Sequence, residues 1–246
     1  MRLLSAAPLF EREVDMGRLD NKRALITGGG SGMGLSTAIL FAEQGADVVI
    51  CGRTKEKLES ASEQVRKTGS RCEPIVADIG KEREIIELIQ KTVDTFGSID
   101  ILINNASIVG QVGPVVDIDL QEWDESIRIN LTGAILCSRE AIRFMKQQGS
   151  GNITNISSMV ARNPFKNRTA YNCCKTALIA FTQTLAKEVG MEGIRVNCIL
   201  PGVVMTERLK ASIVRHAEAA NVPLEKFKNE WKAWSVMNRF VEPEEI

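Results

Sequence analysis

The alternation of short β-branched segments with longer amphipathic segments most constrains the fold of this chain. β-Branched runs predict six strands, at residues 23–27, 47–51, 71–77, 99–103, 152–157 and 194–200. Helical periodicity between them predicts helices at 33–44, 54–67, 81–96, 120–147 and 169–189. Since strands joined through helices pair in parallel with helices on both faces, we expect an α/β fold with a doubly wound, Rossmann-type parallel sheet.

The positions of glycines and the absence of a linker indicate one domain. Glycines that can end helices follow the helical segments at Gly45, Gly69, Gly97, Gly149 and Gly190. No repeat or linker divides residues 21–246, which we expect to form the single domain. Residues 1–20 carry only a short apolar run before several charges and are interpreted as a flexible extension. Residues 205–239 depart from the alternation, and we interpret them as a substrate lid; a surface helix pair is the alternative.

Composition excludes several classes of partner. Lys and Arg number 31, as do Asp and Glu, so no net charge draws the chain to nucleic acid or an anionic membrane. No apolar run reaches the ~20 residues that span a bilayer. The six cysteines are scattered, mostly in apolar segments, which indicates a reducing, cytoplasmic setting. With His216 as the only histidine, neither a metal site nor a serine hydrolase is expected.

A glycine-rich segment, Thr27-Gly28-Gly29-Gly30-Ser31-Gly32-Met33-Gly34, joins the first predicted strand to the first predicted helix. Glycines let backbone N–H groups approach a pyrophosphate, and the N-terminus of the helix favours the anion. A tight turn without a ligand would also require glycines. The segment lacks the Gly-Lys-Ser/Thr ending of ATP-type phosphate loops, so it does not predict Mg-nucleotide chemistry.

The second predicted strand ends at Gly52 and Arg53. In sheets of this type an acid at that position binds the ribose of NAD, whereas a basic side chain can pair with the 2′-phosphate of NADP. Arg53 therefore favours NADP(H) as the cofactor. NAD(H) stays open, because exposed arginines often follow strands.

Tyr171, the only tyrosine, stands four residues before Lys175 at the start of a predicted helix, so phenol and ammonium share a face. A free phenol has a pKa of ~10, and a nearby cation lowers it, which makes an acid/base usable near neutral pH. A surface pair is the alternative interpretation. Ser157 and Ser158 follow the fifth predicted strand at the edge where open α/β sheets bind ligands, and either hydroxyl can hold a substrate oxygen.

Together these motifs resemble the classical short-chain dehydrogenase/reductase family, from about Lys22 to the end of the chain. The resemblance implies four catalytic residues, with Ser158 selected over Ser157 by its spacing from Tyr171: Asn130, Ser158, Tyr171 and Lys175. It also implies a dinucleotide site formed by Gly28, Gly30, Ser31, Gly32, Met33, Gly34, Arg53, Asp78, Ile79, Asn105, Ala106, Tyr171, Lys175, Pro201, Gly202, Val204 and Thr206.

The implied activity is hydride transfer between a nicotinamide and the carbon of a small-molecule carbonyl or alcohol, in a homo-oligomer (dimer or tetramer). Tyr171 would exchange the proton on the substrate oxygen, and Ser158 would hydrogen-bond that oxygen. Lys175 would bind the nicotinamide ribose and lower the pKa of Tyr171, while Asn130 would hold a water that relays protons. Substrate options are 3-oxoacyl, hydroxysteroid, sugar and xenobiotic compounds.

Two other classes of protein remain as alternatives. A non-catalytic NADP-binding sensor or assembly protein would predict loss of a catalytic residue, and none is lost. A methyltransferase shares a glycine loop after its first strand but has no use for the spacing of Tyr171 and Lys175.

Three departures from the family's pattern bear on these expectations. Ser107 replaces the glycine that usually follows Asn104-Asn105-Ala106, and we expect it to narrow the pocket without loss of function. Ser31 stands where many NADP-dependent members have a basic residue, so the NADP preference rests on Arg53 alone. The chain stops at Ile246, before the family's seventh strand at a sheet edge used in subunit packing, so we expect either a truncated sequence or an exposed edge with an altered oligomer.

Overall fold

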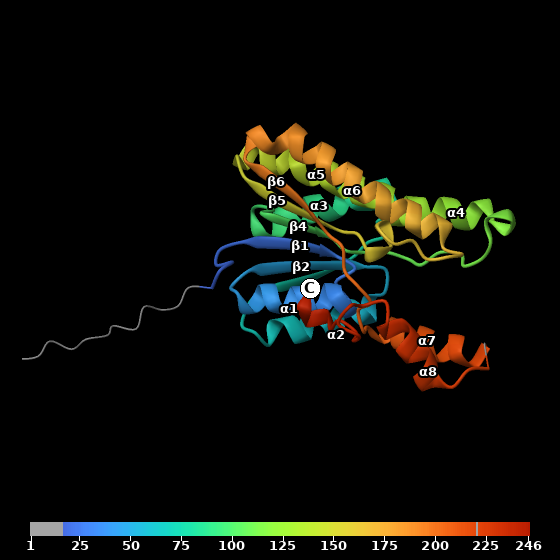
Figure 1. The fold of residues 1–246 in the computed structure, drawn as a ribbon. Coiled ribbons are helices and arrows are strands. Elements are labelled where there is room, and N and C mark those ends of the chain that lie inside the picture. Colours follow the sequence, from blue (N-terminus) through green and yellow to red (C-terminus); the bar gives the residue numbers. More distant parts are fainter. Residues whose placement is uncertain (1–16, 220) are drawn as a thin grey trace, which may run out of the picture.

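A parallel sheet with helices on both faces forms the framework of the protein (Figure 1). The computed structural model describes residues 17–219 and 221–246. The six strands lie in the order β3-β2-β1-β4-β5-β6 and all their pairings are parallel. The strands are β1 Arg23–Thr27, β2 Asp47–Gly52, β3 Cys72–Val76, β4 Ile101–Asn104, β5 Gly151–Ile156 and β6 Ile194–Ile199. This is the doubly wound order, so the predicted Rossmann-type sheet is confirmed.

The helices lie on the two faces of the sheet. Their bounds are α1 Gly32–Glu43, α2 Lys55–Arg66, α3 Glu82–Phe96, α4 Leu120–Ile127, α5 Gly133–Gln148, α6 Thr169–Val189, α7 Glu207–Ala219 and α8 Leu224–Lys232. Figure 1 shows α1 and α2 on one face and α3, α5 and α6 on the other. The long helix predicted at 120–147 is instead two helices joined by a π-helical turn, Arg128–Thr132.

Alternate residues of the central strands face opposite sides of the sheet and contribute to the two hydrophobic layers. Leu25 and Val49 belong to the cluster packed against α3, α5 and α6, whereas Ile26 and Ile50 belong to the cluster packed against α1 and α2. These residues are fully buried, since both faces of a parallel sheet are covered by helices. Burial of the middle of each strand leaves the carboxyl-terminal ends as the places where polar side chains can act.

A buried polar network fixes the carboxyl-terminal ends of β4 and β5 against the helices above them. The Asn104 Nδ2 atom lies 2.8 Å from Asn155 Oδ1 and 3.0 Å from Ser138 Oγ of α5. Asn155 Nδ2 in turn donates to Thr182 Oγ1 of α6 at 2.9 Å. Because buried polar groups are costly unless paired, this network favours one relative placement of the strands and helices.

The ends of the helices follow the glycine prediction, but the glycines differ in backbone conformation. Gly97 and Gly149 adopt left-handed conformations after α3 and α5, with φ of 83° and 66°. Gly190 is the C-cap of α6 as predicted, but its φ is −60°, because the 3₁₀ turn η4 (Gly190–Glu192) follows directly. The reversal occurs at Gly193, whose φ is 75°.

The end of the chain lies beside α1. Val241 forms a parallel bridge with Val204, and the 3₁₀ turn η5 (Pro243–Glu245) packs on α1, where Ser36 Oγ donates to Glu244 Oε1 at 3.1 Å. Within the described residues β6 pairs with β5 only, as expected for an exposed edge. Most of the predicted extension, residues 1–16, lies outside the described residues. No helix in the described part of the chain is long and apolar enough to cross a membrane.

Substitution of alanine at Gly97 and at Gly190 separates backbone strain from packing. A Cβ at either position meets nothing within 4 Å, but only Gly97 has a positive φ. We expect Gly97→Ala to destabilise the protein by about 1 kcal/mol and Gly190→Ala to be neutral or stabilising by about 0.5 kcal/mol, measured by urea unfolding. Equal effects of the two substitutions would contradict the assigned helix ends.

Candidate functional site

The hydroxyl of Thr27 joins the carboxyl-terminal ends of β1 and β4. Thr27 Oγ1 accepts hydrogen bonds from the backbone N–H groups of Asn105 and Ala106, at 3.0 and 3.1 Å, and donates to Ile103 O at 3.3 Å. The Asn105 side chain in turn donates hydrogen bonds to Thr27 O at 2.9 Å and Gly28 O at 3.3 Å. The floor of the glycine loop is thereby attached to β4 through a buried side chain.

Glycines of the loop stand where a side chain would collide with backbone. A Cβ on Gly28 would lie 2.9 Å from Ala106 Cα, and one on Gly34 would meet Gly28 O and Asn105 Nδ2. Gly28 and Gly32 also have positive φ, 68° and 55°. The chain therefore turns from β1 into α1 with its backbone exposed, and Ser31 at the N-cap makes no side-chain capping bond to the helix. Uncapped N–H groups at a helix N-terminus are suited to an anion.

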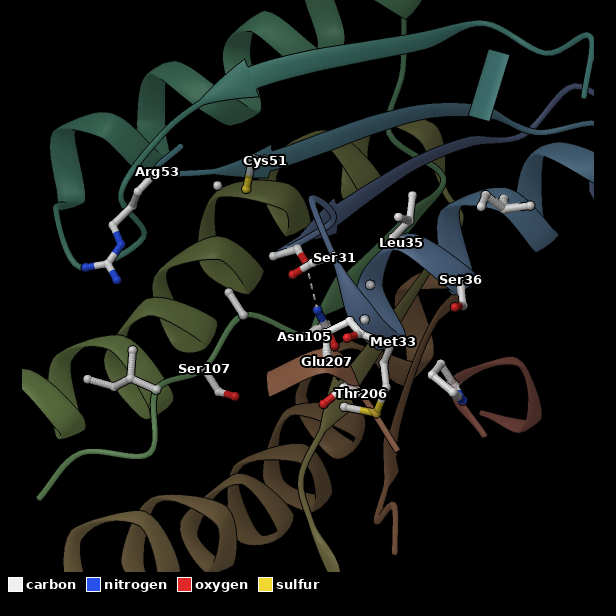
Figure 2. A pocket seen from close by; sticks show the side chains of 18 of the residues that line it. Ser31, Met33, Leu35, Ser36, Cys51, Arg53, Asn105, Ser107, Thr206 and Glu207 are labelled. Atoms are coloured by element: carbon white, nitrogen blue, oxygen red, sulfur yellow. Dashed lines mark hydrogen bonds between the residues drawn. The ribbon is translucent and has the colours of Figure 1, made fainter. Parts of the chain in front are cut away.

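A cavity of about 570 Å³ opens over this loop (Figure 2). Predicted cofactor residues that line it are Gly28, Ser31, Gly32, Met33, Gly34, Arg53, Asp78, Ile79, Asn105, Ala106 and Thr206. Ser107, the departure from the family's glycine, lies in its wall as well. These positions thus come together around one space, although they come from five separate stretches of the chain.

Six predicted cofactor residues do not line this cavity: Gly30, Tyr171, Lys175, Pro201, Gly202 and Val204. Gly30 instead faces Leu58 of α2. Pro201 O accepts from Met159 N at 2.9 Å, and Val204 pairs with Val241. Pro201 and Val204 thus connect the loop after β6 to the segments that contain Met159 and Val241.

Asp78 and Arg53 lie at the ends of β3 and β2. Asp78 Oδ1 accepts from Gly80 N at 2.9 Å, and its own N–H donates to Glu84 Oε2 at 2.7 Å. Hydrogen bonds from Lys81 and from the Asp78 N–H lower the pKa of Glu84. Arg53 is exposed and has no hydrogen bond or ion pair to any described residue, and Figure 2 shows its side chain extending from the end of β2. Its guanidinium is therefore available to an anionic ligand.

Tyr171 and Lys175 lie in the first turns of α6. The Lys175 side chain is 2% exposed, its Nζ donates to Ile156 O at 2.8 Å, and it lies 5.6 Å from the centroid of the Tyr171 ring. Because burial of an ammonium is costly unless it is compensated, a lysine held here by its carbonyl and ring contacts is unlike a surface pair.

The two candidate serines have different surroundings. Ser157 is buried and its hydroxyl donates to Lys175 O at 2.6 Å, which ties the end of β5 to α6. Ser158 is only half-buried and accepts from Val160 N at 3.3 Å at the start of the 3₁₀ turn η3 (Met159–Ala161). Ser158 is therefore the more accessible of the two serines, since Ser157 is buried between β5 and α6.

Asn130 occupies the π-helical turn and is 1% exposed. Its side chain forms a reciprocal pair with the backbone of Ile108: Ile108 N donates to Oδ1 at 2.7 Å, and Nδ2 donates to Ile108 O at 2.9 Å. The amide thus holds the loop after β4 in place. The sequence interpretation, in which Asn130 holds a water, did not include this contact.

The chain's last residues form a wall of the cavity that sequence reasoning missed. Glu242, Pro243 and Glu244 line it, as does Lys210 of α7. The turn is held by Arg239, whose guanidinium makes two hydrogen bonds of 2.7 Å to the Glu245 carboxylate and lowers its pKa to about 2. The Pro-Glu-Glu stretch was visible in the sequence, but nothing local indicates that it packs on α1.

Aromatic contacts connect α8 to the loop before α6. The Phe165 ring packs edge-on against Trp234 and Trp231, with centroid distances of 4.6 and 6.1 Å. Phe165 O accepts from Asn172 Nδ2 at 2.8 Å, next to Tyr171 in the chain. The segment predicted to be a lid therefore contacts the loop that leads to the predicted acid/base.

Comparison with known proteins shows which family the chain resembles. The family model for short chain dehydrogenases matches residues 22–216. The 3-oxoacyl-acyl-carrier-protein reductase of Thermotoga maritima is 34% identical over 213 residues, 85% of this chain and 86% of that protein. NAD+-bound xylitol dehydrogenase aligns with a TM-score of 0.87 and 30% identity, over 92% of this chain and 89% of the other. L-Sorbose reductase from Gluconobacter frateurii, complexed with NADPH and L-sorbose, aligns with a TM-score of 0.88 and 30% identity, over 94% and 88%.

Replacement of Thr27 tests the junction between β1 and β4. Thr27→Val removes the acceptor of two partly buried N–H groups while keeping the side-chain shape, so we expect a loss of about 2–3 kcal/mol in the free energy of unfolding. Thr27→Ser keeps the hydroxyl and is the matched control, with an expected loss below about 1 kcal/mol. Similar losses for both variants, measured by urea unfolding, would show that the methyl group rather than the hydroxyl matters.

Proposed function

Because this chain belongs to the classical short-chain dehydrogenase/reductase family, we propose that it is an NADP(H)-dependent oxidoreductase that interconverts a carbonyl and a secondary alcohol with Tyr171 as its acid/base. The observation that carries the proposal is the buried Lys175 ammonium beside the Tyr171 ring. A fixed positive charge there favours the phenolate form, so proton exchange with a substrate oxygen becomes efficient near neutral pH.

Ser158 and Asn130 have supporting roles in this proposal. The half-buried Ser158 hydroxyl would hydrogen-bond the substrate oxygen as charge develops on it, a contribution worth about 3 kcal/mol where single donors have been removed from other enzymes. The Asn130 side chain is occupied by Ile108, so any proton relay at this position would run through its backbone. We therefore treat its side chain as a positioning group for the loop after β4.

The glycine cradle fits a dinucleotide, since side chains at Gly28 and Gly34 would fill it. A nicotinamide cofactor supplies hydride chemistry when bound. The N–H groups at the start of α1 would hold its pyrophosphate, and Asp78 would accept from the adenine. Arg53 would pair with a 2′-phosphate, which is why NADP(H) is favoured although the similar structures include both an NAD+ and an NADPH complex.

Further parts of the proposal concern substrate and setting. We propose that α7 and α8 form a lid and that the aromatic contacts of Phe165 shape the substrate side. Buried thiols such as Cys51, whose pKa burial raises to about 12, suit a reducing, cytoplasmic compartment. A homo-oligomer is proposed from the family resemblance, and the substrate is a small carbonyl or alcohol compound.

The cofactor preference is tested by fluorescence titration of wild type and Arg53→Ala with NADPH and NADH. We expect wild type to bind NADPH more tightly, and the substitution to weaken NADPH binding about 10- to 100-fold because a charge-assisted hydrogen bond to phosphate is lost. Binding of NADH should not change. Equal loss for both nucleotides would contradict the assignment of Arg53 to the 2′-phosphate.

The chemistry is tested by a panel of carbonyl substrates with wild type and Tyr171→Phe. Loss of the proton donor should lower kcat by about 10²- to 10⁴-fold while nucleotide Kd stays within about twofold. Nucleotide binding without turnover of any substrate by wild type would favour the non-catalytic sensor. Absence of binding by either nucleotide would overturn the proposed function.

A further inference from the structure

Lys210 is a cation of α7 that lines the dinucleotide cavity and that no part of the proposed function uses. The helix begins next to the glycine loop: Thr206 Cγ2 lies 3.1 Å from the point that a Cβ on Gly32 would occupy. Thr206 caps the first turn, with its Oγ1 accepting from Leu209 N at 3.2 Å and its carbonyl accepting from Lys210 N at 2.9 Å. Figure 2 shows Thr206 and Glu207 beside Met33 at this loop. The first turn of α7 is therefore held close to the predicted pyrophosphate position.

Acidic side chains outnumber basic ones among the described residues that line the cavity. Among the described residues that line it, Arg53 and Lys210 are the cations, while the acids are Asp78, Glu207, Glu242 and Glu244. Arg53 lies at the end of β2, on the side assigned to the 2′-phosphate. Lys210 belongs to the other end, where α7 meets the glycine loop. A bound pyrophosphate would thus have one lysine near it among several carboxylates.

Lys210 forms an ion pair with a solvent-exposed carboxylate. Its Nζ lies 2.6 Å from Glu207 Oε1, and the two side chains are 55% and 87% exposed. Glu207 raises the pKa of Lys210, so the ammonium stays charged throughout the neutral range. Exposed ion pairs contribute little to stability, so exchange of Glu207 for another anion is inexpensive.

We propose that Lys210 binds the pyrophosphate of the cofactor. Its ion pair with Glu207 breaks when the cofactor binds, and the first turn of α7 moves onto the bound nucleotide. This inference rests on the proposed function, because it needs a dinucleotide in the cavity. A diphosphate carries more negative charge than one carboxylate, and the N–H groups at the start of α1 would hold it in place. Glu207 then acts as a competitor for the lysine, and the segment predicted to be a lid gains a direct contact with cofactor.

The test compares Lys210→Gln with Lys228→Gln by titration with NADH and NADPH. Lys228 is a matched control, because on α8 it pairs with Glu225 at the same i,i+3 spacing and 2.8 Å, away from the cavity. We expect Lys210→Gln to raise Kd about five- to tenfold for both nucleotides, since both contain the pyrophosphate. The control should leave both values within twofold, and both variants should unfold at nearly the same urea concentration as wild type, because the replaced ion pairs are exposed or partly exposed.

Glu207→Gln supplies a second, independent readout. Removal of the competitor should tighten binding of NADH and NADPH about two- to fivefold, and this gain should shrink when Lys210→Gln is also present. Equal Kd values for Lys210→Gln and the Lys228→Gln control would overturn the inference, as would a loss confined to NADPH, which would assign the lysine to the 2′-phosphate. Failure of wild type to bind either nucleotide is a different result, because it overturns the proposed function itself.

Discussion

The junction between the ends of β1 and β4 is the contact on which the candidate site depends. A single buried hydroxyl, that of Thr27, accepts from two successive N–H groups after β4, while Asn105 holds two carbonyls of the glycine loop. The loop cannot carry side chains of its own at its closest points, so it relies on a neighbouring strand for its shape. Rigidity is thus supplied by β4, and the N–H groups at the start of α1 stay exposed.

Much of this arrangement could be predicted because its signals are local. β-Branched runs of buried strands and the glycine loop need only a few neighbouring residues to be recognised, and strands 23–27 and 47–51 were placed within one residue. Parallel pairing brings all the strand ends to one edge, so Arg53 and Asp78 meet the glycine loop at one cavity without any specific long-range signal. The four-residue spacing of Tyr171 and Lys175 is likewise a property of one helix.

What could not be predicted depends on contacts between distant segments. The π-helical turn at Asn130 breaks a periodicity that reads as one continuous helix, and the pairing of its amide with Ile108 becomes visible only when the loop after β4 is placed. The wall formed by residues 242–244 depends on the Arg239–Glu245 ion pair and on the bridge between Val241 and Val204. Gly190 caps α6 as the sequence predicts, yet the left-handed reversal comes only at Gly193, after the turn η4.

The site combines two kinds of positive charge with different physical roles. Lys175 is withdrawn from water, and its cost of burial is offset by the Ile156 carbonyl and the Tyr171 ring, so its position is fixed before any ligand binds. Arg53 and Lys210 remain solvated, and neither contributes much to folding. A charge that must act on a reacting proton needs a fixed position, because electrostatic stabilisation depends on preorganisation. A charge that only recruits an anion gains from mobility, since it can follow the ligand into the cavity. The same molecule therefore buries the lysine nearest the predicted chemistry and exposes the cations that face the predicted phosphates.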